Sequence, residues 1–200
     1  MNGTARYETP FLRSYARSKL ATDPLYAAVA ERLRGTSGAI ADIGCGIGLM
    51  AAYLREEGFV QPIIGVDHDA AKIEQARRAV PSATFRVGDA RDPIPSDVSC
   101  VLLLDVLHYF DDAEQSAILA NAARAELVVI RDGLHDGSWR YRATKLGEMF
   151  ARGIRWTKGE RLNFPTRERI ADAFAGFASE VSPMWGATPF NNYLFVFRKP

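Results

Sequence analysis

Five short apolar runs alternate along this chain with segments of helix length, and this alternation limits the fold more than any other feature. The runs are AIADIG (39–44), PIIGVD (62–67), ATFRVG (83–88), VSCVLLLD (98–105) and ELVVIRD (126–132). Near-continuous apolar runs are typical of parallel strands that are buried on both faces. The segments LMAAYLREEG, AAKIEQARRAV and DAEQSAILANAARA between them predict crossover helices. The pattern therefore predicts an α/β fold with a doubly wound parallel sheet and helices on both faces.

Further helices and strands are predicted at the two ends of this alternation. The helices cover residues 8–20, 24–34, 138–152 and 166–175. Two closing strands follow, GFASEVSPMW (176–185) and NNYLFVFRK (191–199). The loop between these strands is short and carries Gly and Pro, which favours a hairpin-like antiparallel return.

The composition narrows the classes of function. The formal net charge is +1 and the pI is about 7.8, so no global charge attracts nucleic acid or an anionic membrane surface. The longest apolar stretch, VLLLDVL, is short and is interrupted by Asp105, so no membrane span is expected. Cys45 and Cys100 are far apart and match neither a disulfide framework nor a metal knuckle. We therefore expect a cytoplasmic protein with no metal site.

The stretch ADIGCGIGLM (41–50) places Gly44, Gly46 and Gly48 directly after the first predicted strand. Glycines at the carboxyl end of a parallel strand let backbone N–H groups approach a ligand, and the following helix N-terminus favours a negative group. The alternative is a strand-to-helix turn that binds nothing. A dinucleotide fingerprint G-x-G-x-x-G would need a third glycine where Leu49 stands. The loop thus predicts a bound ligand and disfavours a nicotinamide dinucleotide.

Acidic residues stand at or near the ends of the neighbouring strand runs. Asp42 lies near the end of the first run, Asp67 ends the second, Asp89 follows the third and Asp105 ends the fourth. Because carboxyl ends of adjacent parallel strands meet at one edge of a sheet, we expect these residues to line one crevice. Asp67 is suited to accept hydrogen bonds from both hydroxyls of a ribose. A single Asp after a strand can instead form a turn or cap a helix.

These motifs, in this order, resemble those of the class I S-adenosylmethionine-dependent methyltransferases. DIGCGIG resembles the first motif of that family, GVDHD the second, GDARD the adenine motif and LLLDVLHYF the fourth. The resemblance covers residues 25–198 and implies a Rossmann-like seven-stranded sheet of order 3-2-1-4-5-7-6 with strand 7 antiparallel. It also implies S-adenosyl-L-methionine as the cofactor. The stretch YARSKLATDP resembles, more narrowly, small methyltransferases of bacterial aryl-polyene pigment clusters.

The same resemblance implies how the motif residues would bind that cofactor. The three glycines would lie under its methionine part, and Asp42 would order the loop and reach the amino group. Asp67 would bind the ribose diol, with His68 beside the adenosine. Asp89 and the backbone next to it would contact the adenine edge, and Asp105 would face cofactor and substrate together. The implied cofactor-binding set is Asp42, Gly44, Gly46, Gly48, Asp67, His68, Asp89, Ala90 and Asp105.

We expect one methyltransferase domain over residues 1–200, because no repeat, low-complexity tract or linker divides the chain. Residues 1–36 would form an N-terminal helical extension or a lid. Residues 37–132 would form the cofactor-binding core, and residues 133–200 a substrate cap together with the closing strands.

Methyl transfer to a hydroxyl or an acidic C–H group requires that a proton be removed, and histidine is the first residue type to consider. His68 belongs to the cofactor motif, whereas His108 and His135 follow the fourth and fifth strands, at the edge where a substrate would enter. We predict His108 as the catalytic base because it lies in a motif, at the start of the helix after the fourth strand, and we rank His135 second. A solvated or helix-capping histidine is the alternative for each. Alignment of the reacting groups alone is worth roughly 7–11 kcal/mol, so a base is not needed for every acceptor.

Residues 138–169 are unusually basic, with nine Lys or Arg against three Glu, a local charge of +6. Aromatic residues are interleaved with these cations, at Trp139, Tyr141, Trp156 and Phe164. Such a segment could recognise a carboxylate, a phosphate or an acidic carrier protein, or it could be a solvated helix and loop. The residues that we expect on the substrate side are Tyr15, Tyr109, Arg140 and Tyr141.

The sequence therefore favours a methyltransferase that acts on a small molecule in biosynthetic metabolism. The expected acceptor is an oxygen atom on a phenolic or carboxylate-bearing molecule, which a carrier protein could hold. Nucleic acid is not an expected substrate, because the fourth motif is not of the NPPY or DPPY type. A regulator or scaffold that binds S-adenosylmethionine or S-adenosylhomocysteine without catalysis is the alternative. A nucleotide-dependent oxidoreductase is disfavoured by Leu49.

Overall fold

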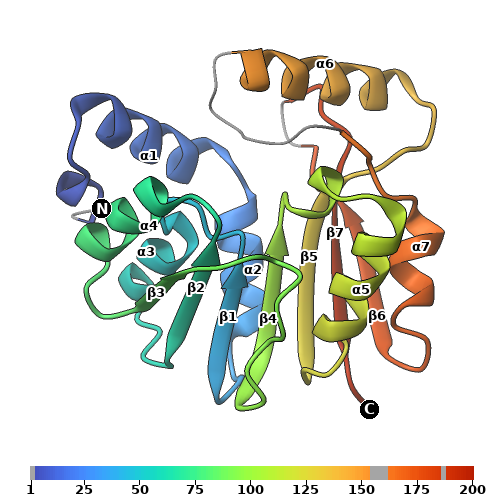
Figure 1. Cartoon of the computed structure of the whole chain (residues 1–200), viewed down its shortest axis with the longest axis horizontal. Coiled ribbons are helices and arrows are strands. Elements are labelled where there is room, and N and C mark those ends of the chain that lie inside the picture. Colours follow the sequence, from blue (N-terminus) through green and yellow to red (C-terminus); the bar gives the residue numbers. More distant parts are fainter. Residues whose placement is uncertain (1–2, 154–161, 186–187) are drawn as a thin grey trace. The chain divides into compact units, whose positions relative to one another are not determined.

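The computed structural model describes residues 3–153, 162–185 and 188–200, and it confirms the predicted α/β fold (Figure 1). Within these residues seven strands form one sheet of order β3-β2-β1-β4-β5-β7-β6. Strand β7 is antiparallel to both β5 and β6. The strand order and the reversed seventh strand that the resemblance implied are therefore confirmed. The chain forms two compact units, residues 1–102 and 103–200.

In the first unit, helices connect parallel strands as the alternation of the sequence predicted. Strand β1 pairs with β2, and β2 pairs with β3, both in parallel. Helix α4 packs on β2 and β3, and α2 packs on α3. The elements are η1 (Gly3–Arg6), α1 (Pro10–Thr22), α2 (Leu25–Leu33), β1 (Ala39–Ile43), α3 (Leu49–Glu56), β2 (Ile63–Asp67), α4 (Ala70–Ala79), β3 (Thr84–Val87) and β4 (Val98–Leu104), the last of which crosses into the second unit.

The helices of the first unit begin at side-chain caps. The Thr9 hydroxyl accepts a hydrogen bond from the Leu12 N–H at the start of α1, and Asp69 caps α4 through the N–H groups of Ala71 and Lys72. Helix α3 differs, because its N-cap is Gly48 and no side chain caps it. The N-terminus of the helix after the glycine loop is therefore left without a side chain over its first N–H groups.

In the second unit, β7 pairs with β5 along its whole length, from Leu127↔Arg198 to Gly133↔Asn192. The helix after η2 begins with a capping box, in which Asp111 and Glu114 each accept a hydrogen bond from the backbone of the other. The elements are η2 (Leu107–Tyr109), α5 (Asp112–Ala122), β5 (Leu127–Gly133), α6 (Trp139–Gly153), α7 (Arg167–Asp172), β6 (Ala178–Pro183) and β7 (Asn192–Arg198).

The two outer strands of the sheet are more exposed than the continuous apolar runs indicated. In β3 only Phe85 is buried, and none of the residues of β6 is fully buried. The inner strands β1 and β5 are buried at every residue. An outer strand has a neighbour on one side only, so its side chains need not be apolar on both faces.

Each unit has its own apolar core. Fully buried side chains of the first unit are Leu33, Ile40, Leu54, Ile63 and Ile73, and those of the second are Leu103, Leu107, Ile118, Phe195 and Phe197. Both cysteines, Cys45 and Cys100, are buried, and no disulfide joins them within the described residues. In the described part of the chain no helix has both the length and the apolar character that crossing a membrane requires.

Candidate functional site

The loop between β1 and α3 follows a course that only glycine adopts without strain. The φ angles of Gly44, Gly46 and Gly48 are 76°, 54° and 76°, in the left-handed region. A Cβ atom on Gly48 would also approach Ala76 and Phe85 to 3.0 and 3.1 Å. The glycines are therefore required by the backbone itself. A Cβ atom on Gly46 would meet nothing within 4 Å, and the binding of a ligand at this loop stays a prediction.

Asp67, at the end of β2, holds this loop in place. Its Oδ2 accepts a hydrogen bond of 2.9 Å from the Gly46 N–H, and its Oδ1 accepts one of 2.9 Å from the Asp69 N–H. The side chain is buried. Because a carboxylate oxygen can accept more than one hydrogen bond, both oxygens retain capacity for the two hydroxyls of a ribose. The predicted ribose contact thus stays a prediction, but Asp67 has a second task that the sequence did not reveal.

Asp42, on β1, is a buried acid close to Asp67. Burial, and after it the negative charge of Asp67, raises the pKa of Asp42 from 3.8 to about 7. Two carboxyl groups on adjacent strands favour a positive group near the loop and oppose a pyrophosphate. S-adenosylmethionine carries a sulfonium and an ammonium group, so the donor set of this unit suits it, whereas the anionic bridge of a dinucleotide would be repelled.

His68, Asp89 and Ala90 lie beyond β2 and β3. His68 is exposed, with Nδ1 3.5 Å from Asp67 Oδ1. Asp89 accepts hydrogen bonds from Arg91, 2.9 Å from its N–H and 2.7 Å from Nε, and the Arg91 side chain is the main cause of its lowered pKa. Ala90 is partly exposed. Their contacts with an adenosine group remain predictions, and Arg91 is a partner of Asp89 that the sequence reading did not single out.

The N-terminal segment is tied to the glycine loop by Tyr7, which we had not predicted as a site residue. Tyr7 is buried, and its hydroxyl donates a hydrogen bond of 3.1 Å to the Ile47 carbonyl. Burial, with the nearby Tyr15 as a lesser cause, raises the pKa of Tyr7. Tyr15, the predicted substrate residue on α1, is partly exposed. Within the first unit, therefore, Tyr7 is a residue in contact with the loop that the sequence analysis did not select.

In the second unit, His108 lies on the short 3-10 helix η2 and not, as predicted, at the start of the α-helix after the fourth strand. It is buried, so it is neither a solvated nor a helix-capping histidine. Its Nδ1 is 2.7 Å from Oδ1 of Asp132, a fully buried residue of β5. Asp132 also accepts hydrogen bonds from the N–H groups of Leu107 (2.9 Å) and Gly133 (2.8 Å). The sequence reading missed Asp132.

The other ring nitrogen of His108, Nε2, is buried and has no hydrogen-bond partner among the described residues. Glu148 Oε2, on α6, lies 3.9 Å away and accepts a hydrogen bond of 3.2 Å from the Tyr109 hydroxyl. Phe164 stacks on the imidazole with ring centroids 5.2 Å apart. Tyr109, a predicted substrate residue, and Glu148, which the sequence reading did not select, thus lie beside the predicted base.

Asp105 directly follows β4 and has a φ of 60°, the one positive φ of a non-glycine residue in the described ranges. Its carboxylate forms an ion pair with the buried Arg131 of β5, and its N–H donates a hydrogen bond of 2.7 Å to the Arg131 carbonyl. Such strained backbone is concentrated at functional sites. Asp105 is therefore held by Arg131 and does not cap a helix.

His135, the second candidate base, is exposed. Its ring stacks on Tyr141 with centroids 4.5 Å apart, and Tyr141 meets Phe164 edge to face at 5.7 Å. Phe164 is also the residue that stacks on His108. Tyr141 and the two histidines therefore belong to one aromatic cluster of the second unit, and their assignment to the substrate side stays a prediction.

Arg140 lies between two tryptophans. Its guanidinium carbon is 4.8 Å from the Trp139 ring centroid and 4.5 Å from that of Trp185, and Nη1 donates a hydrogen bond of 2.8 Å to the Thr188 carbonyl. This cation is already engaged by the chain itself. The side chains of Arg152, Arg155, Trp156, Lys158, Glu160 and Arg161, which the basic segment included, lie outside the described residues.

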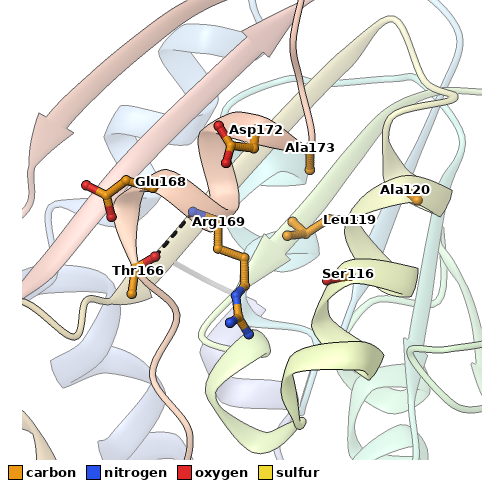
Figure 2. A pocket seen from close by; sticks show the side chains of 8 residues that line it. All are labelled: Ser116, Leu119, Ala120, Thr166, Glu168, Arg169, Asp172 and Ala173. Carbon is orange, nitrogen blue, oxygen red and sulfur yellow. Dashed lines mark hydrogen bonds between the residues drawn. The ribbon is translucent and has the colours of Figure 1, made fainter.

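A groove of about 540 Å³ lies between α5 and α7 in the second unit (Figure 2). Its lining residues are Ser116, Leu119, Ala120, Thr166, Glu168, Arg169, Asp172 and Ala173. None of these was predicted as a site residue. Arg169 also pairs with Asp112, which lowers the pKa of Asp112 to about 2. Across the described residues, no three His, Cys, Asp or Glu side chains gather as a metal ion would require.

Comparisons with known proteins show what this chain is similar to. The family model described as a methyltransferase domain matches residues 40–126. No curated protein matches the chain in sequence. Magnesium protoporphyrin IX methyltransferase from Synechocystis PCC 6803 with bound SAH has a similar structure, with a TM-score of 0.70 and 17% identity over 96% of this chain and 89% of that chain.

Two further structures are similar. Geranyl diphosphate methyltransferase in complex with GPP and sinefungin has a TM-score of 0.65 and 15% identity, covering 88% of this chain and 77% of that chain. A structure described as "Conversion of a Disulfide Bond into a Thioacetal Group during Echinomycin Biosynthesis" has a TM-score of 0.64 and 23% identity, covering 89% of this chain and 82% of that chain. At these identities the likeness shows a shared fold.

Proposed function

We propose that this chain transfers the methyl group of S-adenosylmethionine to an oxygen atom of a small molecule. The premise is that the chain carries a methyltransferase domain with the class I methyltransferase fold. The observation that carries the proposal is the glycine loop of the first unit, tied by Asp67 and placed near the buried acid Asp42. In this unit the glycines leave the backbone free of side chains, the Asp67 carboxylate can accept hydrogen bonds from a ribose diol, and the two acidic residues favour a cation. Those are the features that the cofactor needs.

When bound, the cofactor supplies an electrophilic methyl group, whose bond to sulfur breaks with the electron pair left on sulfur. Gly44, Gly46 and Gly48 then bind its methionine part, and Asp42 and Asp67 bind its amino group and ribose. His68, Asp89, Ala90 and Asp105 complete the proposed set. Residues 37–132 act as the cofactor-binding core of one domain, residues 1–36 as an extension or lid, and residues 133–200 as the substrate cap.

On the acceptor side, His108 takes the proton of a hydroxyl group. A buried imidazole nitrogen with no hydrogen-bond partner among the described residues destabilises the folded protein, and a role in proton transfer accounts for its presence. Tyr109, Tyr141, Arg140 and Tyr15 are the proposed acceptor-side residues. We propose His135, which is exposed, only as a second base. A phenolic hydroxyl suits this aromatic cluster, and a cytoplasmic biosynthetic role such as that of the aryl-polyene methyltransferases is consistent with it.

An acidic carrier protein is the proposed partner if the acceptor is presented in bound form. Among the described side chains of α6, exposed apolar ones include Trp139, Leu146 and Met149, and the exposed cations Arg142 and Lys145 lie on the same helix. Apolar surface beside positive charge suits a partner whose contact surface is acidic and partly apolar. Free and carrier-bound forms of an acceptor distinguish this partner from a free small molecule.

The change Asp67→Ala should weaken cofactor binding by about 2–4 kcal/mol, because a buried charged acceptor loses both ribose hydroxyls and the loop loses the partner of Gly46 N–H. Calorimetric titration with S-adenosylmethionine measures the loss. Asp69→Ala is the matched control, since it removes a nearby carboxylate that caps α4 and should cost stability without a comparable loss of affinity. A change of only a few tenths of a kcal/mol in the Asp67 variant would exclude this residue from the site.

The decisive test of the proposed function is transfer of an isotope-labelled methyl group. The chain is incubated with labelled S-adenosylmethionine and either a panel of phenols, carboxylic acids and amines or a host-cell extract, and the products are separated by liquid chromatography with mass detection. We expect a labelled O-methyl product and one S-adenosylhomocysteine for each product formed. Binding of the cofactor without any transfer would instead establish the non-catalytic regulator or scaffold. Labelled N- or C-methyl products would overturn the oxygen acceptor.

A further inference from the structure

We propose that Asp132 is a positioning residue for proton removal. It holds His108 in the tautomer whose unprotonated Nε2 can accept the proton of the acceptor hydroxyl, and Glu148 faces the positive charge that the imidazole then carries. The inference rests on the proposed function and deepens it. The juxtaposition of Asp132, His108 and Glu148 lies within the second unit, and Asp132 and Glu148 were not predicted from the sequence.

The hydrogen bonds of Asp132 determine which nitrogen of His108 carries the proton. Its Oδ2 accepts from the Leu107 N–H, and its Oδ1 accepts from the Gly133 N–H and lies 2.7 Å from His108 Nδ1. An ionised carboxylate can only accept, so Nδ1 must donate. The neutral ring therefore carries its lone pair on Nε2, and that nitrogen is the one that can act as a base.

The imidazole is fixed in this orientation before any acceptor binds. Phe164 stacks on one face of the ring, and the Asn163 N–H donates a hydrogen bond of 2.8 Å to the His108 carbonyl. Leu107, directly before His108, is held by Asp132. The ring is thus held by its own backbone, by the neighbouring strand and by the segment before α7. Such preorganisation removes a cost that would otherwise be part of the barrier.

The charged groups around the ring are acidic. They are Asp132 on β5, Glu148 on α6 and Asp105 after β4, and the Tyr109 hydroxyl donates to Glu148. Burial by itself lowers the pKa of His108, but the Asp132 carboxylate and the charges of Glu148 and Asp105 outweigh it, so the pKa is raised. The same charges disfavour an acceptor that arrives as an anion. The acceptor is therefore expected as a neutral hydroxyl, which must lose its proton at this site.

The proton can be followed through the step. As the new carbon–oxygen bond forms, the acceptor O–H bond breaks, its electron pair stays on oxygen, and the proton passes to Nε2. The imidazolium then lies between Asp132 and Glu148, whose Oε2 is 3.9 Å from Nε2. The Glu148 side chain is 28% exposed, so the proton can return to solvent past it. The net change is a methylated acceptor, S-adenosylhomocysteine and one released proton.

Nitrogen NMR of the imidazole rings tests the proposal without any acceptor. The chain has three histidines, and the His108 signals are identified by their loss in His108→Gln. In the wild type we expect the neutral ring to be protonated at Nδ1. In Asp132→Asn the proton affinity of His108 should fall by about tenfold or more, because the carboxylate charge is lost. Glu148→Gln should produce a smaller fall. A neutral ring protonated at Nε2 would overturn the proposal, and so would a His108 titration that Asp132→Asn leaves unchanged.

The pH dependence of turnover separates positioning from a purely structural role. With an acceptor from the methyl-transfer screen, the rate should rise with pH through the ionisation of His108, and in Asp132→Asn the midpoint should move down together with the NMR titration. A slower variant whose midpoint does not move would overturn the role of Asp132. Asp97→Asn, which removes an exposed carboxylate, is the control and should keep the wild-type midpoint. If Asp132→Asn does not fold, the tautomer of His108 in the wild type and the titration of His108 in Glu148→Gln still test the proposal. Failure of methyl transfer itself would count against the proposed function, whereas the NMR result stands apart from it.

Discussion

Replacing His108 with Gln should slow methyl transfer by about 10²- to 10⁴-fold, the usual contribution of a positioned general base. Gln keeps a polar group that can still donate to Asp132, but it has no nitrogen that takes up a proton at neutral pH. The partner of His108 Nδ1 is Asp132, which is not in the proposed cofactor-binding set, so the affinity for S-adenosylhomocysteine should change little. Turnover with a phenolic acceptor and calorimetric titration with S-adenosylhomocysteine measure the two quantities.

His135→Gln is the matched control for this prediction. His135 is exposed and stacks on Tyr141, so its replacement removes an aromatic contact at the surface but no buried base. Its effect on turnover should be far smaller. If instead His135→Gln slows transfer and His108→Gln does not, the base is His135. If neither does, alignment of the reacting groups is sufficient for this acceptor.

The sequence predicted the fold well because the signals for it are local. Short apolar runs end at Gly or Asp, and the loops between strands and helices carry their own turn and cap residues, as in Asp69 before α4 and Asp111 before α5. The positive φ angles of Gly44, Gly46 and Gly48 require glycine at all three positions, which makes the motif easy to recognise in the sequence. The residues predicted a strand at 191–199 and its antiparallel return after the preceding strand, whereas the place of this strand between the fifth and sixth came from the resemblance to a family.

The parts of the site that the sequence did not reveal depend on contacts between distant residues. His108 is buried partly by Phe164, and its partner Asp132 is 24 positions away. A signal for Asp132 was present, since it ends the fifth apolar run as Asp67 ends the second. Glu148 gave no such signal, because it is the one acidic residue in a helix sequence whose other charged residues are Lys and Arg. Tyr7 likewise contacts Ile47 across 40 positions.

The burial of Asp42 leads to a prediction for stability as a function of pH. The folded-state pKa of about 7 exceeds the ordinary 3.8, so between these values the folded chain binds a proton that the unfolded chain has released. The stability that this group contributes is fully present below pH 4 and is lost as the pH rises through 7. Three pKa units correspond to a loss of about 4 kcal/mol in the free energy of unfolding.

Asp42→Asn should remove this fall, because an amide has no proton to lose in that range. Urea unfolding of both proteins at pH 5 and pH 8 measures it, and between these two pH values the variant should gain about 3 kcal/mol on the wild type. The exposed Asp97→Asn is the control and should leave the slope unchanged. Parallel pH profiles for Asp42→Asn and wild type would show that Asp42 is ionised in the folded chain. Saturating S-adenosylmethionine should flatten the wild-type profile as well, since an ammonium group beside Asp42 favours the ionised acid and lowers its pKa. A flattened profile would support the proposed contact between Asp42 and the amino group of the cofactor, and an unchanged profile would count against it.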